Sequence, residues 1–121
     1  MGTSLGELMD VAAKLAKSGN DDEAIESYLS VVEIDEENAT VWYCLGVLYT
    51  RTGNLDMAVK AFEKSDHILP NHPPTQANLA YLLADSNPLS ASIFAKSALA
   101  TISDDENLIS IADYSEPELR K

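Results

Sequence analysis

The sequence is poor in the residues that build disulfides and metal sites. Its 121 residues include one cysteine, Cys44, and two histidines, His67 and His72. A single cysteine cannot form a disulfide within the chain, which fits a reducing compartment. No further cysteine or histidine is spaced to complete a zinc site with the histidine pair. We therefore expect no internal disulfide, no metal and no cofactor, and we interpret both histidines as surface residues.

Positive charge is also scarce. The chain has 8 lysines and arginines against 20 aspartates and glutamates, which gives a formal net charge of −12. Nucleic-acid binding needs clustered cations that displace counterions from phosphates, and anionic membrane surfaces attract basic segments. The composition therefore disfavours both partners. A negative field attracts basic polypeptide segments instead.

Long apolar runs are missing as well. Apolar residues make up 45% of the chain, enough for a core, but they are dispersed and no run could cross a bilayer. The segment from Met1 to Asp10 lacks the basic flank and continuous apolar stretch of a signal peptide. These features predict an ordered, cytoplasmic protein.

Motifs for catalysis are not apparent. The sequence has no glycine-rich phosphate loop and no nucleophile elbow. As a nucleophile, Cys44 would need a histidine and an orienting group beside it, so we interpret it as a small apolar filler. The acidic clusters at 21–23, 35–37 and 104–106 lack the spacing and central glycine of a calcium loop. Favourable carboxylates at helix starts explain them, and we expect no enzymatic activity.

What the sequence does contain is a repeated pattern, clearest at residues 39–72. Two amphipathic helical patterns are joined there by Gly53-Asn54 and closed by Pro70. The two helices carry large and small residues at fixed offsets, namely Trp42, Leu45, Gly46, Tyr49, Ala58 and Phe62. These offsets, together with a length of about 34 residues, closely resemble a tetratricopeptide repeat (TPR).

A second copy lies one period earlier, in register. Gly19-Asn20 repeats the turn, and the corresponding helix positions are Leu8, Val11, Ala12, Leu15, Ala24 and Tyr28. The small residue at Ala12 or Gly46 allows two helix backbones to approach closely. A capping box at 4–7 predicts the start of the first helix. Residues 20–23 are expected to cap the second, which should extend to about Ile34.

A third, weaker copy begins at Pro73. It keeps the first-helix core positions Leu79, Ala80 and Leu83, while Asn87 replaces the turn glycine. The next residue, Pro88, suits the first position of a helix because its missing N–H needs no partner there. A degenerate last repeat is expected where the stacking of repeats ends.

The resemblance implies an all-α fold, a right-handed solenoid of three helix-turn-helix repeats. We expect a single TPR domain over residues 1–121, with repeats at about 5–38, 39–72 and 73–106 and a capping segment and tail at 107–121. A short helix at roughly 106–114 is expected to cap the last repeat. Beyond Glu116 we expect disorder.

The resemblance also implies a concave groove, lined by the first helix of each repeat, that binds a polypeptide segment. The groove residues it implies are Met9, Asp10, Ala13, Ala16, Lys17, Thr40, Tyr43, Cys44, Val47, Thr50, Arg51, Ala77, Asn78, Tyr81, Ala84 and Asp85. The alternative is an ordinary solvated helix face with half-buried tyrosines. By this fold-level analogy we predict a non-catalytic protein–protein interaction module, an adaptor or chaperone-like scaffold.

One function of the family can be checked against the sequence. TPR co-chaperones that bind the acidic C-termini of Hsp70 and Hsp90 use a clamp of Lys, Asn, Asn, Lys and Arg. The corresponding residues here are Met9, Ala13, Cys44, Pro74 and Asn78. None of the three cations is present, so nothing would balance the ligand carboxylates. We predict no binding of such tails.

The last repeat leaves an alternative open. Its second helix is apolar around much of its circumference, at Leu89, Ile93, Phe94, Ala95, Ala98, Leu99 and Ile102. An apolar surface of that size needs a cover, which either the tail or a second chain could supply. The alternative function is therefore a self-assembling unit that forms dimers or larger oligomers through Leu89, Ile93 and Phe94.

Overall fold

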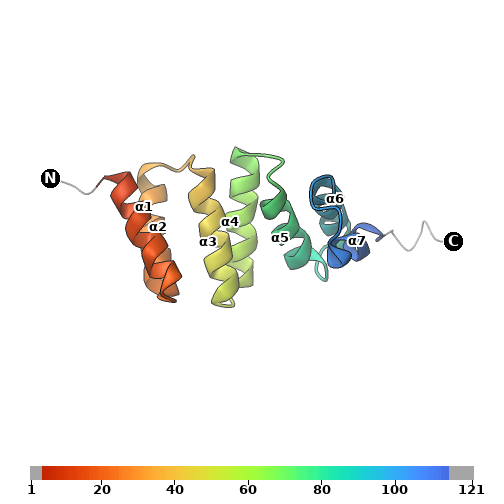
Figure 1. Cartoon of the computed structure of the whole chain (residues 1–121), viewed down its shortest axis with the longest axis horizontal. Helices are drawn as coiled ribbons and strands as arrows, with labels where there is room; N and C mark the ends of the chain where they lie inside the picture. Colours follow the sequence, from red (N-terminus) through yellow and green to blue (C-terminus); the bar gives the residue numbers. More distant parts are fainter. Residues whose placement is uncertain (1–3, 115–121) are drawn as a thin grey trace. The chain divides into compact units, whose positions relative to one another are not determined.

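The computed structural model describes residues 4–114, which form seven helices and no strand (Figure 1). The helices are α1 (Leu5–Lys17), α2 (Asp21–Ile34), α3 (Ala39–Arg51), α4 (Leu55–Ile68), α5 (Pro73–Leu83), α6 (Pro88–Leu99) and α7 (Glu106–Ala112). The expected all-α architecture with a short C-terminal helix is confirmed. The disorder expected beyond Glu116 lies outside the described residues.

Side-chain caps fix where several helices begin. The side chains of Ser4, Asn38 and Asp105 each accept a hydrogen bond of 3.1 Å from a backbone N–H in the first turn of α1, α3 and α7. Each bond satisfies one of the N–H groups that lack a partner at a helix start. Gly19 and Gly53 follow α1 and α3 with φ near +80° (83° and 82°), a left-handed conformation that favours glycine.

The start of α2 differs from the expectation. Asn20 occupies the N-cap position, but its side chain makes no capping hydrogen bond. Its Nδ2 instead donates to the Ser18 hydroxyl at 3.1 Å. Acidic residues in the first turn, including Asp21, lie at the positive end of the helix dipole, where carboxylates are favoured.

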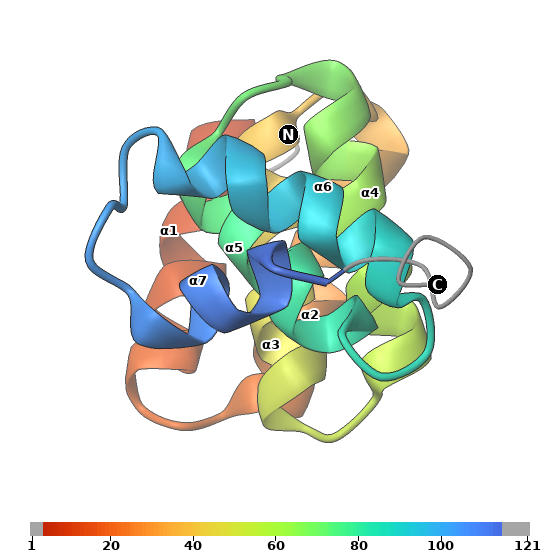
Figure 2. The same cartoon turned by 90° about the vertical axis from the view of Figure 1, so that its right-hand side faces the viewer.

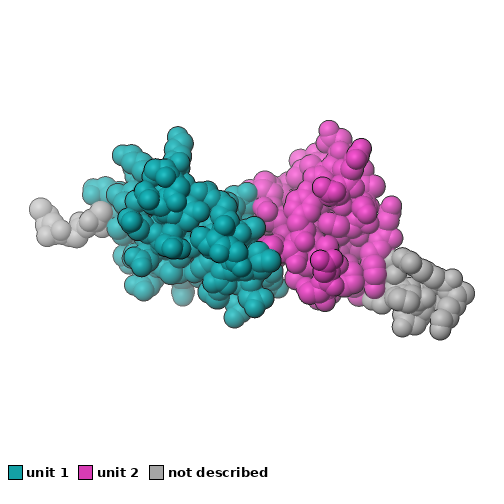
Figure 3. Space-filling model, turned by 90° about the horizontal axis from the view of Figure 1, so that it is seen from below, with its two compact units in different colours: residues 1–68 teal, residues 69–121 magenta. Residues whose placement is uncertain are grey.

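The chain divides into two compact units, Met1–Ile68 and Leu69–Lys121 (Figure 3). In the first unit, α1 packs against α2, α2 against α3, and α3 against α4. Its core consists of fully or nearly fully buried side chains from all four helices, including Ala12, Val31, Leu45, Leu48 and Phe62. The closest approach is at Gly46, where an added Cβ would lie 2.7 Å from ring carbons of Phe62.

The second unit contains α5, α6 and α7. Figure 2 shows α7 lying beside α5 and α6, and its contacts are made mostly with α6. The core is built of small side chains around one leucine, namely Ala77, Ala80, Ala95, Ala98, Leu108 and Ala112. Phe94 is partly buried against this cluster, whereas Leu89 and Ile93 are 47% and 58% exposed. The capping helix therefore covers the inner face of α6 and leaves two apolar side chains in solvent.

None of the described helices is long and apolar enough to cross a membrane. The helix pairs start at Leu5, Ala39 and Pro73, which are 34 residues apart (39 − 5 and 73 − 39).

Candidate functional site

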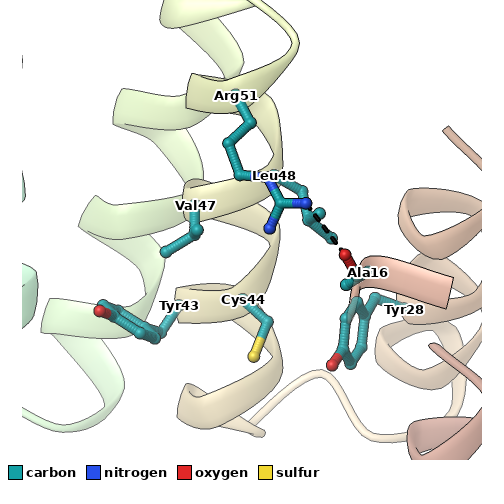
Figure 4. A pocket seen from close by; sticks show the side chains of 7 residues that line it. All are labelled: Ala16, Tyr28, Tyr43, Cys44, Val47, Leu48 and Arg51. Carbon is teal, nitrogen blue, oxygen red and sulfur yellow. Dashed lines mark hydrogen bonds between the residues drawn. The ribbon is translucent and has the colours of Figure 1, made fainter. Parts of the chain in front are cut away.

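A cavity of about 290 Å³ opens on the first unit, against one face of α3 (Figure 4). It is lined by side chains from the end of α1, from α2 and mainly from α3, namely Ala16, Tyr28, Tyr43, Cys44, Val47, Leu48 and Arg51. The five α3 residues share a face because positions four apart in a helix lie one above the other. We call this space the α3 cavity.

Arg51 closes one end of the α3 cavity and is held by the preceding repeat. Its guanidinium donates hydrogen bonds to the Ala16 carbonyl oxygen at 3.0 Å and to an Asp21 carboxylate oxygen at 2.6 Å. The first of these bonds is drawn in Figure 4. Asp21 thus neutralises the positive charge of Arg51. Because the pair is partly exposed, it contributes at most about 1 kcal/mol to stability.

Two tyrosines lie on either side of Cys44 (Figure 4). Burial, and then the neighbouring Cys44 thiol, raise the pKa of Tyr28 to about 12, so that its hydroxyl stays neutral at physiological pH. The Tyr43 ring packs edge-on against Phe62, with ring centroids 5.6 Å apart. No histidine lines the cavity. The site therefore presents apolar surface and a neutral hydroxyl, with no base to activate the thiol.

The structure brings part of the predicted groove together. Five of the predicted residues line the α3 cavity: Ala16, Tyr43, Cys44, Val47 and Arg51. Five others on α1 and α3 are exposed but do not line it, namely Asp10, Ala13, Lys17, Thr40 and Thr50. The half-buried Met9 accepts a weak hydrogen bond from Asn38 through its sulfur, at 3.8 Å.

Sequence reasoning did not identify two of the lining residues. Tyr28 aligns with the core residue Phe62 in the repeat, so the pattern indicated only a buried position. Leu48 lies four residues after Cys44 and one before Tyr49, on a face that the repeat pattern assigns to the core. For Leu48, its helical spacing from Cys44 and Arg51 was the available signal, whereas no spacing connects Tyr28 on α2 with residues of α3.

The third-repeat residues lie in the second unit, where α7 changes their surroundings. The prediction that Ala77 is an accessible groove residue is wrong, because it is 7% exposed within the cluster that includes Leu108. The Tyr81 hydroxyl donates to the Asp105 carboxylate at the start of α7. The Asn78 amide nitrogen donates to the Pro74 carbonyl oxygen at 2.8 Å, and Asp85 is exposed.

The contact between Tyr81 and Asp105 shifts the pKa of both side chains. Burial, then the hydrogen bond and negative charge of Asp105, raise the pKa of Tyr81 to about 12. The same hydrogen bond, with the backbone N–H of Leu108, holds the pKa of Asp105 below its usual range. Within residues 4–114, no three or more acidic, histidine or cysteine side chains are grouped so that they could hold a metal ion.

Two family models match the chain. One, described as a TPR repeat, matches residues 14–53, and the other, described as a tetratricopeptide repeat, matches residues 39–71. Residues 14–71 therefore consist of tetratricopeptide repeats, and the predicted family is confirmed.

The chain is also similar to part of two plant proteins. It is 34% identical over 58 residues to the probable UDP-N-acetylglucosamine–peptide N-acetylglucosaminyltransferase SPINDLY of Oryza sativa subsp. japonica, and 33% identical over 58 residues to that of Hordeum vulgare. Each match covers 48% of this chain and 6% of the plant protein. The chain thus spans a small part of these relatives.

Solved structures share the fold. The first TPR of Spaghetti (RPAP3), bound to the HSP90 peptide SRMEEVD, has a TM-score of 0.79 at 16% identity, with 97% of this chain and 94% of that chain covered. The Yersinia enterocolitica type III secretion chaperone SycD, in complex with a peptide of the translocator YopD, has a TM-score of 0.75 at 17% identity, with 91% and 86% covered. At these identities the similarity shows the fold alone.

Proposed function

We propose that this protein is a non-catalytic protein–protein interaction module that binds a polypeptide segment at the α3 cavity, as an adaptor or chaperone-like scaffold. The observation that carries the proposal is an apolar cavity of about 290 Å³ on the open face of α3, lined by Tyr43, Cys44 and Val47. Binding sites are typically concave, apolar and equipped with a few polar groups. Two structures of the same fold, RPAP3 and SycD, were determined with peptides bound.

The α3 cavity has room for one bulky apolar side chain. Burying such a side chain contributes about 1.5–3 kcal/mol, which corresponds to weak binding on its own. A partner therefore needs further contacts along the exposed residues of α3, such as Thr40 and Thr50. The tyrosine hydroxyls beside the cavity supply polar contacts that fix the orientation of the segment.

At the α3 cavity, the charge of the protein supports a basic partner and opposes an acidic one. The net charge of −12 attracts cationic segments and repels nucleic acid and anionic membranes. Arg51, the one cation at the α3 cavity, is already paired with Asp21. We therefore maintain that the acidic tails of Hsp70 and Hsp90 are not ligands of the α3 cavity, although the RPAP3 neighbour was determined with an HSP90 peptide. The cytoplasmic location stays a prediction.

The test is capture of the partner with a cavity-filling variant. Val47→Arg places a long cationic side chain in the α3 cavity, so proteins retained from source lysate by the wild type are expected to be lost. Val11→Arg makes the same change at an exposed site on α1 that does not line the cavity, and is the matched control. Equal retention by Val47→Arg and the wild type would contradict the proposal.

A second candidate function is self-association through α6. Leu89 and Ile93 are exposed on this helix and could meet the same residues of a second copy. Ile93→Glu would then lower the mass measured by light scattering from that of an oligomer to that of a monomer. Phe94 is unsuitable for this test because it packs against the core of the second unit. A wild type that is already monomeric would exclude this function.

A further inference from the structure

A second and larger cavity, of about 410 Å³, lies on the first unit. It is lined by residues of α2, of the turn after it, of α3 and of α4, namely Leu29, Glu36, Trp42, Tyr49, Met57, Lys60, Ala61 and Lys64. It shares no residue with the α3 cavity. We call it the Trp42 cavity, and the proposed function makes no use of it.

The apolar wall of the Trp42 cavity is held in place by the surrounding structure. The Trp42 indole N–H donates to the Glu36 carbonyl oxygen at 2.9 Å, which ties the ring to the turn between α2 and α3. Ala61 is buried, whereas Met57 is more than a third exposed. An immobilised indole next to a flexible methionine can accept a bulky apolar side chain at a small entropic cost.

Tyr49 adds a polar group without a partner. The residue is only 8% exposed, yet its hydroxyl has no hydrogen-bond partner among residues 4–114. In that part of the chain, every side-chain nitrogen or oxygen sealed from solvent has a partner. The Tyr49 hydroxyl is therefore reached by solvent, and a ligand that displaces this water must offer it a hydrogen bond.

The rim of the Trp42 cavity carries two lysines one turn apart on α4. Within the described residues, neither Lys60 nor Lys64 has a carboxylate within ion-pair distance, in contrast to Arg51. They are two of the 8 cations in a chain with 20 anionic side chains. The cavity thus combines an apolar interior with a local positive charge. Glu36, on the turn, is the only acidic residue in its lining.

We propose that the Trp42 cavity is a docking site for a short acidic segment of a partner protein that carries one bulky apolar side chain. The apolar side chain enters between Trp42 and Met57, and carboxylates beside it pair with Lys60 and Lys64. Charges beyond the Debye length, about 8 Å at physiological salt, are screened, so a short segment meets the lysines rather than the net negative charge. The Trp42 cavity thus prefers an acidic segment, whereas the α3 cavity is proposed to prefer a basic one.

Trp42 is the only tryptophan of the chain, so its fluorescence reports on the cavity directly. The probe is a short synthetic peptide with a central Leu-Phe pair flanked by glutamates. One matched peptide has lysines in place of the glutamates, and the other has serines in place of the Leu-Phe pair. We expect a saturable shift of the Trp42 emission with the acidic Leu-Phe peptide and not with the other two.

Charge reversal tests the role of the rim. Lys60→Glu with Lys64→Glu is expected to weaken binding of the acidic peptide about tenfold, because two attractive pairs become repulsive. The control, Lys14→Glu with Lys17→Glu, makes the same charge change at exposed positions of α1 that do not line the cavity. It should leave binding within about twofold of the wild type. Val47→Arg, in the α3 cavity, should also bind normally.

Three results would overturn the proposal. The first is the absence of a saturable change with the acidic Leu-Phe peptide. The second is equal or tighter binding of the lysine peptide. The third is an equal loss in the Lys60→Glu/Lys64→Glu and Lys14→Glu/Lys17→Glu variants, which would show attraction by overall charge instead of a site.

Discussion

At the scale of single residues, Gly46 sets the distance between α3 and α4. A Cβ at this position would lie 2.7 Å from three ring carbons of Phe62, which is fully buried. The Phe62 ring also contacts Tyr43 edge-on and so links this helix crossing to the α3 cavity. The need for a small residue here was apparent from the repeat pattern. The identity of the ring it faces required the structure.

Gly46→Ala is therefore expected to lower the free energy of unfolding by about 1–3 kcal/mol, the usual cost of overpacking a core. Gly6→Ala makes the same chemical change in the first turn of α1, where an added Cβ would meet only the Ser4 hydroxyl oxygen at 4.0 Å. That control should be neutral or stabilise by up to about 1 kcal/mol through helix propensity. Urea denaturation measures both. Unchanged stability of Gly46→Ala would show that Phe62 moves aside freely.

At the scale of helices, the sequence predicted where helices start and end better than it predicted which residues they pack against. Caps such as Ser4 and the turn glycines are local signals, and α1 begins where its capping box indicated. The apolar residues of 106–114 showed that a helix could form there. They did not show that Leu108 would bury Ala77, because periodicity identifies an apolar face but not its partner.

The link between α5 and α7 has a predictable pH dependence. The pKa of Asp105 is held below its usual value in the folded protein, first by the hydrogen bond from Tyr81. Its stabilising contribution is therefore present above the unfolded-state pKa, about 3.9, and is lost as the pH falls through the lower, folded-state pKa.

Tyr81→Phe should accordingly melt at a lower temperature than the wild type at neutral pH. The difference should shrink as the pH falls below about 3.9 and Asp105 becomes protonated. Thermal denaturation across a pH series measures it, and NMR titration should show the pKa of Asp105 moving up in the variant. A melting difference that is independent of pH would mean that the hydroxyl contributes through packing instead.

At the scale of the whole molecule, the sequence shows the net charge but not how the individual cations are paired. The sequence showed the net charge of −12 and the TPR pattern, and these predicted the fold and a binding role. The sequence could not show which of the few lysines and arginines form ion pairs. Arg51 is paired with Asp21, whereas Lys60 and Lys64 have no ion-pair partner within residues 4–114. Such pairings depend on side chains from different helices, which sequence spacing does not bring together.

The most direct test of the proposed function uses Cys44, the only thiol in the chain, which lines the α3 cavity. The measurement is its rate of alkylation by iodoacetamide, with and without a saturating amount of the polypeptide segment retained by the wild type and lost by Val47→Arg. If the segment occupies the α3 cavity, alkylation should slow in proportion to the occupied fraction. An unchanged rate at saturation would place the segment elsewhere and contradict the proposed function.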